Sequence, residues 1–359
     1  MKLVNRTVLP VIAICASSAF AGSLNFDVRF DWDNTTYNSD HASAANSGKS
    51  DFVMQTGRLD YKGKYNEDLS YRFRYRFNRD DHTVRNDSLS NEIDMAFIAH
   101  KLNDDFTLTM GKFNSDLGGY DASLPGSEVY LKTRNYALIH DGTTYTGRRA
   151  YVTGAKVTAA LGDHELNVFA ADNREGSTVA SQTRAMSGAV LKGNFMEKAL
   201  AVHLSYATEK ANGGTGSVAS DLDAKYSFMT IGAKYEVPEW FAALDISSNT
   251  AGKVTVATVQ NDYAMTSTVL HAGYNMDKYT FKAVYETSAA KLSPVGGTDT
   301  KTTTTGMGLA AEYKPSNEKN FRYHVAMTNR SDKADSAGAQ TQTETHVLAG
   351  VRLYADFLK

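Results

Sequence analysis

Hydrophobic and polar residues alternate one by one along much of the chain. In residues 23–32 the apolar side chains occupy every second position, from Leu24 to Trp32, and Asn, Asp and Arg fill the positions between them. Residues 69–77 repeat this period of two, with Leu, Tyr and Phe against Ser, Arg and Asn. Successive side chains of a β-strand point to opposite faces, so each segment predicts a strand between an apolar medium and water.

The same alternation predicts strands throughout the sequence, and no helical period of comparable length competes with it. The clearest further segments are residues 106–110, 200–206, 240–246, 279–285, 307–313, 321–327 and 345–357. We therefore expect an all-β fold.

Short and long connections between these segments also alternate. Short polar turns are expected at residues 66–68, 103–105, 162–164, 193–198, 236–239, 275–278 and 314–317. The longer connections, such as residues 33–50, 208–223 and 288–302, are rich in Gly, Ser, Thr, Asn and Asp. Seven turns and eight long loops join about sixteen strands. An even number of antiparallel strands with unequal connections at the two ends is typical of bacterial membrane barrels.

Aromatic residues indicate which apolar medium the strands face. One set flanks the short turns: Tyr65, Tyr235, Trp240, Tyr274, Tyr279, Tyr313 and Phe321. A second set lies near the long-loop ends: Trp32, Phe77, Tyr206, Tyr226 and Tyr285. Two such rows describe girdles at the two membrane interfaces. The alternative, a soluble sandwich or propeller, explains neither the rows nor the unequal connections, so we predict a transmembrane antiparallel β-barrel of about sixteen strands.

The N-terminal segment has the pattern of an export signal. Two basic residues precede an apolar run at residues 8–15, and a small-x-small cleavage site, Ala-Phe-Ala, follows at residues 19–21. We expect residues 1–21 to be a cleaved signal peptide and residues 22–359 to form a single barrel domain. Cleavage removes the only cysteine, Cys15, so this barrel is expected to be held by its strand ladder and packing.

Composition and charge exclude two other classes of protein. The mean hydropathy is −0.39. After the N-terminal segment, no run of about 18 apolar residues remains that could form a membrane helix. The formal net charge of −2 argues against a nucleic-acid partner, which requires a strongly basic face.

With these features the chain resembles the Gram-negative outer-membrane porin family, whose members are sixteen-stranded trimeric channels. The resemblance covers residues 22–359. Its most specific part is the expected fifth strand at residues 106–112, which precedes the longest segment without a strand pattern, roughly residues 113–149. The resemblance implies that this third long loop folds into the lumen and narrows the pore. It also implies a homotrimer surrounded by outer-membrane lipid and lipopolysaccharide.

Two features depart from the porin pattern. Residues 124–128, Leu-Pro-Gly-Ser-Glu, stand where enteric porins carry a Pro-Glu-Phe-Gly-Gly stretch. Porins usually end on the aromatic residue that the assembly machinery reads, whereas Leu358 and Lys359 follow Phe357 here. The second departure concerns assembly rather than the class of the protein.

Charged residues on the inward face of a channel control what it conducts. Arg72, Arg74 and Arg76 alternate with aromatic residues, so they share one water-facing stripe at intervals of roughly 6.6 Å. The neighbouring strand places further basic residues on the same parity, with Asp60 among them. The predicted pore-lining basic wall comprises Arg58, Lys62, Arg72, Arg74 and Arg76.

The long loop supplies four predicted constriction acids: Asp116, Asp121, Glu128 and Asp141. By resemblance to general porins, a basic wall facing an acidic loop produces a transverse field that orients dipolar solutes. The alternative is that these side chains are only solvated charges of the lumen.

We expect a general-diffusion porin, a water-filled channel that passes small hydrophilic solutes passively. An alternative channel is selective for phosphate or another anion, because some porin relatives use arginine ladders in that way. A barrel enzyme or a surface-structural protein is the alternative outside channels. The sequence has no nucleophile elbow, His-Glu-x-x-His or phosphate loop, so we predict no catalytic residue, metal site or cofactor. His324 and His346, on expected neighbouring strands, are interpreted as wetted lumen side chains.

Overall fold

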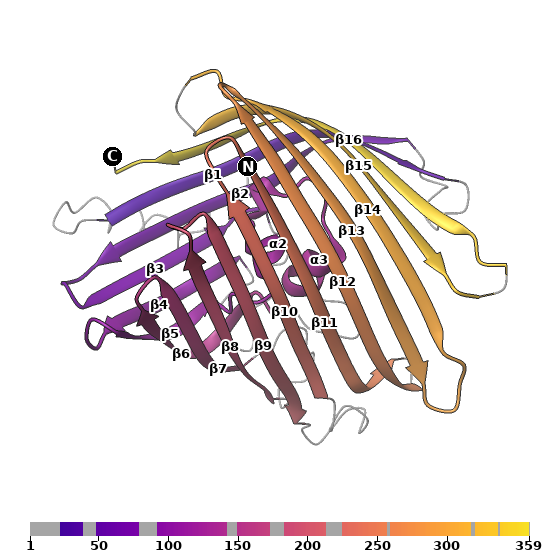
Figure 1. Ribbon diagram of the computed structural model, residues 1–359, viewed down its shortest axis with the longest axis horizontal. Coiled ribbons are helices and arrows are strands. Elements are labelled where there is room, and N and C mark those ends of the chain that lie inside the picture. The colour runs from indigo at the N-terminus through magenta and orange to yellow at the C-terminus, as the bar shows by residue number, and fades with distance from the viewer. Residues whose placement is uncertain are drawn as a thin grey trace, which may run out of the picture.

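Sixteen strands close into one antiparallel barrel in the computed structural model (Figure 1). The structure describes residues 22–38, 48–78, 92–141, 149–172, 183–212, 225–256, 259–316, 320–336 and 338–358. Each strand pairs with its neighbours in sequence, and the first strand pairs with the last. The predicted fold class and strand number are confirmed. The predicted signal peptide lies outside the described residues.

The strands follow one another around the barrel in chain order. Their bounds are β1 (Gly22–Tyr37), β2 (Lys49–Lys64), β3 (Leu69–Arg76), β4 (Ile93–Lys101), β5 (Phe106–Asn114), β6 (Tyr151–Leu161), β7 (His164–Asp172), β8 (Thr183–Phe195), β9 (Leu200–Asn212), β10 (Lys225–Glu236), β11 (Trp240–Val256), β12 (Val259–Met276), β13 (Tyr279–Pro294), β14 (Thr300–Tyr313), β15 (Phe321–Ala334) and β16 (Thr341–Asp356). The short connections lie where the sequence predicts turns, so we refer below to a turn end and a long-loop end of the barrel.

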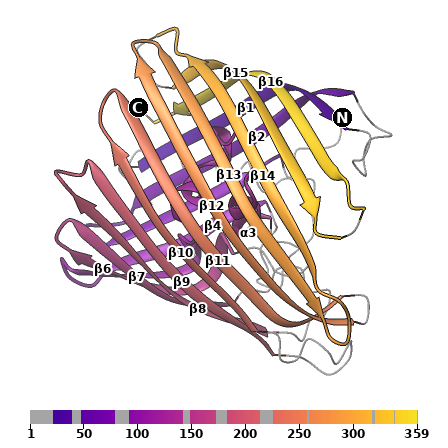
Figure 2. The same cartoon turned by 45° about the vertical axis from the view of Figure 1, so that its right-hand side comes forward.

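Strand length differs between the two sides of the barrel. β3 has 8 residues and β7 has 9, whereas β11 has 17 and β12 has 18. Figure 2 shows the long strands β11–β14 rising together along one wall. The barrel is therefore tall on one side and low on the side of β3–β7.

Outward and inward positions alternate as the sequence predicts. On β14, Met307 and Leu309 are 56% and 66% exposed on the outer face, while Ala310 is buried inside. At the turn end, the half-buried ring of Tyr235 and the exposed ring of Trp240 lie 5.3 Å apart, and further aromatic residues continue this row. The girdle predicted at the turn end is therefore present.

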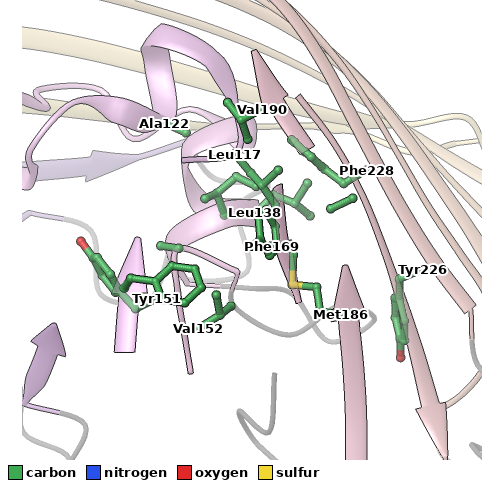
Figure 3. Close-up of a cluster of buried hydrophobic side chains, with 14 of the residues drawn as sticks. Leu117, Ala122, Leu138, Tyr151, Val152, Phe169, Met186, Val190, Tyr226 and Phe228 are labelled. Atoms are coloured by element: carbon green, nitrogen blue, oxygen red, sulfur yellow. The ribbon is translucent and has the colours of Figure 1, made fainter. Parts of the chain in front are cut away.

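For one residue of the second girdle, Tyr226, the prediction is wrong. Tyr226 is only 4% exposed, and its ring belongs to a cluster inside the lumen (Figure 3). It pairs in register with Glu209 and Ala251, both of which are buried. The period of two fixes the face by parity, and Tyr226 has the parity of the inward residues of β10.

The hydrophobic core of this protein lies within the barrel rather than around it. The labelled side chains of Figure 3 come from the segment after β5 and from β6, β7, β8 and β10. Phe169, Met186 and Phe228 supply the wall, and each is at most 2% exposed. Close packing of this cluster fills the lumen at the long-loop end on the side of β4–β12.

Candidate functional site

The segment after β5 runs through the lumen and contacts several walls of the barrel. We call residues 115–141 the constriction loop. It contains two helices and a 3-10 turn: α2 (Gly119–Ser123), η2 (Gly126–Glu128) and α3 (Arg134–His140). Figure 1 shows α2 and α3 inside the barrel, and α3 can be followed again in Figure 2. The predicted placement of this loop agrees with its contacts to strands far from β5.

The first anchor of the loop is on β11. The backbone N–H groups of Tyr120 and Asp121 donate to the carboxylate of Asp245 at 3.0 and 2.7 Å. Gly119 precedes them with a φ of +75°, and a Cβ at this position would collide with the Asp245 carboxylate. Glycine is therefore required where the loop approaches the wall.

The second anchor is apolar. Leu138 and Ile139 of α3 are at most 1% exposed and pack into the cluster shown in Figure 3. Thr133 caps the helix by accepting from the N–H of Tyr136 at 3.0 Å. Burial of these two aliphatic side chains stabilises the docked loop by about 1.5–3 kcal/mol each.

Among the described residues, several hollows lie beside the loop, and two of them flank residues 129–131, one toward each end of the barrel. The hollow at the long-loop end has a volume of about 360 Å³ and is lined by residues of β1, β2, β3, β15 and β16, with Arg76 among them. The hollow at the turn end has a volume of about 190 Å³ and is lined mainly by β11–β14, with Lys282 and Glu128 among its residues. Val129, Tyr130 and Leu131 line both. We call these three residues the partition.

Each residue of the partition contacts the wall. Arg29 of β1 donates to the carbonyl of Val129 at 2.6 Å. The hydroxyl of Tyr130 donates to Glu312 of β14 at 2.9 Å. Leu131 lies against Gly308, where an added Cβ would come within 3.2 Å of the leucine Cβ. The partition therefore lies between the two hollows and contacts the wall at β1 and at β14.

Three residues of the predicted basic wall converge on a single carboxylate. The nearest nitrogens of Arg58, Arg74 and Arg76 lie 3.8, 3.4 and 3.0 Å from Oδ2 of Asp94, a fully buried residue of β4. The guanidinium of Arg74 also lies over the ring of Tyr151, 5.0 Å from its centroid. Among the described residues, three positive charges thus share one negative charge.

The remaining two residues of the basic wall lie nearer the turn end. Arg72 binds Asp60 through two hydrogen bonds of 2.8 and 2.6 Å. Lys62 is half-exposed, and its ammonium lies 4.0 Å from the same carboxylate. Because Arg58 and Arg74 are 5% and 9% exposed, the wall is not the continuous wetted stripe that the sequence suggests. Arg76 is the member that lines the hollow at the long-loop end.

Two of the predicted loop acids bind partners away from the basic wall of β2 and β3. Asp121 accepts from Nε2 of His271 on β12 at 2.9 Å and from the hydroxyl of Thr133 at 2.6 Å. Asp116 lies 2.9 Å from Lys192 and 3.5 Å from Lys156. Burial raises the pKa of Asp116, but the two ammonium groups outweigh it and the net pKa is lowered.

The other two acids also have their own partners. Asp141 lies 2.7 Å from Lys132 within the loop, and both side chains are exposed. Glu128 contacts three cations of the wall: Lys282 of β13 at 2.7 Å, Arg322 of β15 at 2.9 Å, and Arg352 of β16. We call these three the cation triad. Burial raises the pKa of Glu128, but the cation triad holds it well below its usual range.

The four acids were expected to face the basic wall of β2 and β3, and these contacts show that they bind other partners. In the part of the chain that the structure describes, none of the four acids forms an ion pair with Arg58, Arg72, Arg74 or Arg76. The physical reason is the path of the loop: Asp116 meets β6 and β8 directly after β5, and the loop then carries Asp121 and Glu128 to β12–β16.

The cation triad and Arg29 are not among the functional residues predicted from the sequence. The signal for an inward position was present, because Lys282, Arg322 and Arg352 each stand between apolar outward neighbours. Parity alone does not select these three among the many inward charges. Their importance depends on where the loop touches the wall.

The histidines are less wetted than expected. His324 is 3% exposed, and its Nε2 lies 2.8 Å from Asp31. His346 contacts Asp33 at 3.0 Å and Glu344 at 2.9 Å. Among the described residues, no group of three or more His, Cys, Asp or Glu side chains could hold a metal ion.

Comparisons with known proteins agree with this geometry. The model of the family described as phosphate-selective porin O and P matches residues 24–235. A search of curated proteins finds no match. Among the described residues, no helix is both long and apolar enough to cross a membrane.

Several solved structures are similar in fold. An anion-selective porin from Comamonas acidovorans has a TM-score of 0.63 at 13% identity, covering 94% of this chain and 100% of that one. The outer-membrane channel DcaP of Acinetobacter baumannii has a TM-score of 0.62 at 12% identity, covering 93% and 98%. The trimer form of OmpT from Vibrio cholerae has a TM-score of 0.58 at 13% identity, covering 93% and 100%.

Proposed function

The chain belongs to the phosphate-selective porin O and P family, and on that premise we propose that it conducts small hydrophilic solutes passively with a preference for anions. The protein is an outer-membrane channel. The preference is the part that we add to the expected general-diffusion porin.

The observation that carries this proposal is the convergence of Arg58, Arg74 and Arg76 on Asp94. Guanidinium groups stay charged at any relevant pH, so burial does not remove their charge by deprotonation. A narrow lumen with low-dielectric walls focuses the field of such a cluster into the water path. Arg76 brings this field to the hollow at the long-loop end, where a solute enters the channel.

The comparisons also support a preference of the channel for anions. The family description refers to phosphate selectivity, and the similar porin from Comamonas acidovorans is described as anion-selective. For this chain, anion preference rests on its own arginine cluster. The proposal assigns no catalytic step, metal or cofactor to the channel.

Zero-current potentials across a salt gradient test the preference. Purified protein in planar bilayers at about 0.1 M salt should show an anion-selective potential, and Arg76→Gln should shift it toward cations. Lys291→Gln is the matched control, because Lys291 loses the same charge on an exposed residue paired with Asp299. The shift should shrink toward 1 M salt, where the Debye length falls from about 10 Å to about 3 Å.

Three outcomes would contradict the proposal. A cation-selective wild type or an unchanged potential in Arg76→Gln would remove the role of the arginine cluster. Equal shifts in the two variants would indicate a general charge effect. Protein that is inserted but does not conduct would favour a barrel enzyme or a surface-structural protein instead.

We further propose that the protein is a homotrimer in contact with outer-membrane lipid and lipopolysaccharide, and that residues 1–21 are the export signal of a single barrel domain. A trimer is supported by the aromatic outer face of β1–β3, where the ring of Phe26 lies 5.9 Å from Phe77. The ring of Phe357 lies 5.8 Å from Phe26 on its other side. Among the structures of similar fold, OmpT of Vibrio cholerae is described in a trimer form.

A further inference from the structure

The contacts of Glu128 differ from those of a residue that only lines a pore. Its carboxylate is held by the cation triad, whose members come from three different strands. A carboxylate held by several cations has the geometry of an oxyanion in a binding site. Here the occupant is a residue of the protein's own loop.

Carboxylates of the barrel wall, and not only Glu128 of the loop, hold the three side chains of the cation triad. Lys282 lies 2.7 Å from Glu312, and Arg322 lies 3.5 Å from the same carboxylate. Arg352 donates to Asp27 at 2.8 Å. Glu312 and Asp27 belong to the barrel wall, so they keep the three cations in place when the loop moves. Without Glu128, three positive charges face these two negative charges, and the site has a surplus of one.

Arg322 has unused capacity for a ligand. The residue is 5% exposed, and its Nε is buried without a hydrogen-bond partner in the described structure. Its other nitrogens donate to Glu128 at 2.9 Å and to the carbonyl of Ser127 at 3.1 Å. A buried donor without a partner is costly, and an oxyanion with more acceptor oxygens than a carboxylate can satisfy it.

The site is joined directly to the partition. Glu128 immediately precedes Val129, and Glu128 and Lys282 both line the hollow at the turn end. The partition itself also contacts the wall, through the two hydrogen bonds, the packing of Leu131 on Gly308 and the guanidinium of Arg29, which lies 4.4 Å from the centre of the Tyr130 ring. Glu128 therefore adds three ion pairs to the wall directly beside the partition, and the next ion pair to the wall along the loop is that of Arg134 with Asp332.

We propose that the cation triad is an oxyanion site which Glu128 occupies in the resting state, and that a small oxyanion competes with Glu128 and releases the partition from the wall. The ligand is a small oxyanion such as a phosphate or a carboxylate. The two have the chemistry needed to replace a glutamate side chain on two arginines and a lysine. This inference rests on the proposed anion-conducting function and adds to it a solute-operated latch.

The accessibility of Leu131 reports release of the partition. Leu131 is 7% exposed, and replacing it with cysteine creates the only thiol of residues 22–359. We expect Leu131→Cys in detergent to react slowly with a thiol reagent. The rate should rise and saturate as inorganic phosphate replaces chloride at constant ionic strength. A second series with acetate distinguishes the ligands: a response to phosphate alone identifies a phosphate site, and a response to both identifies a general oxyanion site.

Variants of the loop acids separate the latch from a general charge effect. In the Leu131→Cys background, Glu128→Gln should react at least about tenfold faster without phosphate, the ratio expected for losing one charge-assisted hydrogen bond. Phosphate should not accelerate it further. Asp141→Asn is the matched control, because it removes one loop carboxylate that contacts Lys132 and not the cation triad.

Equal rates in Glu128→Gln and Asp141→Asn, or no effect of phosphate and acetate on Leu131→Cys, would overturn the proposal. If Glu128→Gln fails to fold, Arg352→Gln replaces it. This variant should need more phosphate for the same acceleration, and an unchanged phosphate dependence would contradict the latch. The thiol assay does not require conduction. A phosphate response without conductance would therefore refute the proposed channel selectivity while leaving the latch in place.

Discussion

Phe73 and Ser70 lie on the same strand and face opposite media. In the register of β3, Phe73 pairs with Tyr61 on the outer face, whereas Ser70 pairs with Lys64 on the inner face. We predict that Phe73→Arg impairs folding into membranes, because an arginine on the outer face near the midplane costs roughly 2–4 kcal/mol. Ser70→Arg should fold normally, because its guanidinium meets water near the turn end. Folding into lipid vesicles, followed by the change of electrophoretic mobility on heating, measures both. Equal behaviour of the two variants would show that the parity of β3 is misassigned.

At the scale of elements, α3 carries a pH-sensitive contact. Nε2 of His140 lies 2.8 Å from the carbonyl of Ala122, so the neutral ring donates a hydrogen bond to the loop. Burial lowers the pKa of His140 to about 4 from the ordinary 6.5. Arg76 and Arg58 lower it as well, whereas the bond to Ala122 and the charge of Asp141 oppose this shift.

A lowered pKa in the docked state means that docking is most stable above pH 6.5 and weakens as the pH falls toward about 4. We expect the population of undocked α3 to rise by up to about tenfold per pH unit in this window. Thiol modification of Leu138→Cys between pH 7.5 and 4.5 measures it, and His140→Gln in the same background corrects for the reagent's own pH dependence. Parallel pH profiles with and without His140 would contradict this assignment. Glu128 stays ionised in this window, because the cation triad lowers its pKa.

At the scale of the whole molecule, the outer face of β1–β3 is where we expect neighbouring subunits to meet. Phe30 is 47% exposed on this face, and Phe281 on β13, four strands from β1 around the barrel, is 44% exposed. We predict a trimer that survives electrophoresis without heating. Phe30→Gln should lower its dissociation temperature, because burial of an aromatic side chain contributes about 1.5–3 kcal/mol. Phe281→Gln should leave it unchanged. A monomer by native mass spectrometry, or equal effects of the two substitutions, would exclude this interface.

The sequence by itself determined the strands, their faces and the class of the protein. Outward and inward positions on a strand depend only on local parity, so the inward positions of Arg72, Arg74 and Arg76 could be predicted without a structure. The alternation of turns and loops fixed the number of strands for the same reason, because each connection is local. Tyr226 shows the limit of composition as a guide, since its aromatic character suggested a girdle and its parity placed it inside.

Only the tertiary structure decided which inward charges act together. Glu128 meets Lys282 and Arg322 across separations of 154 and 194 residues, and no local pattern connects them. The path of the constriction loop is set by the approach of Gly119 to Asp245 and by the apolar cluster that receives Leu138. These contacts form because burial of the loop's apolar side chains and pairing of its charges are satisfied together on distant strands. The sequence therefore determined what the wall presents to the lumen, and the fold decided which of those side chains meet the loop.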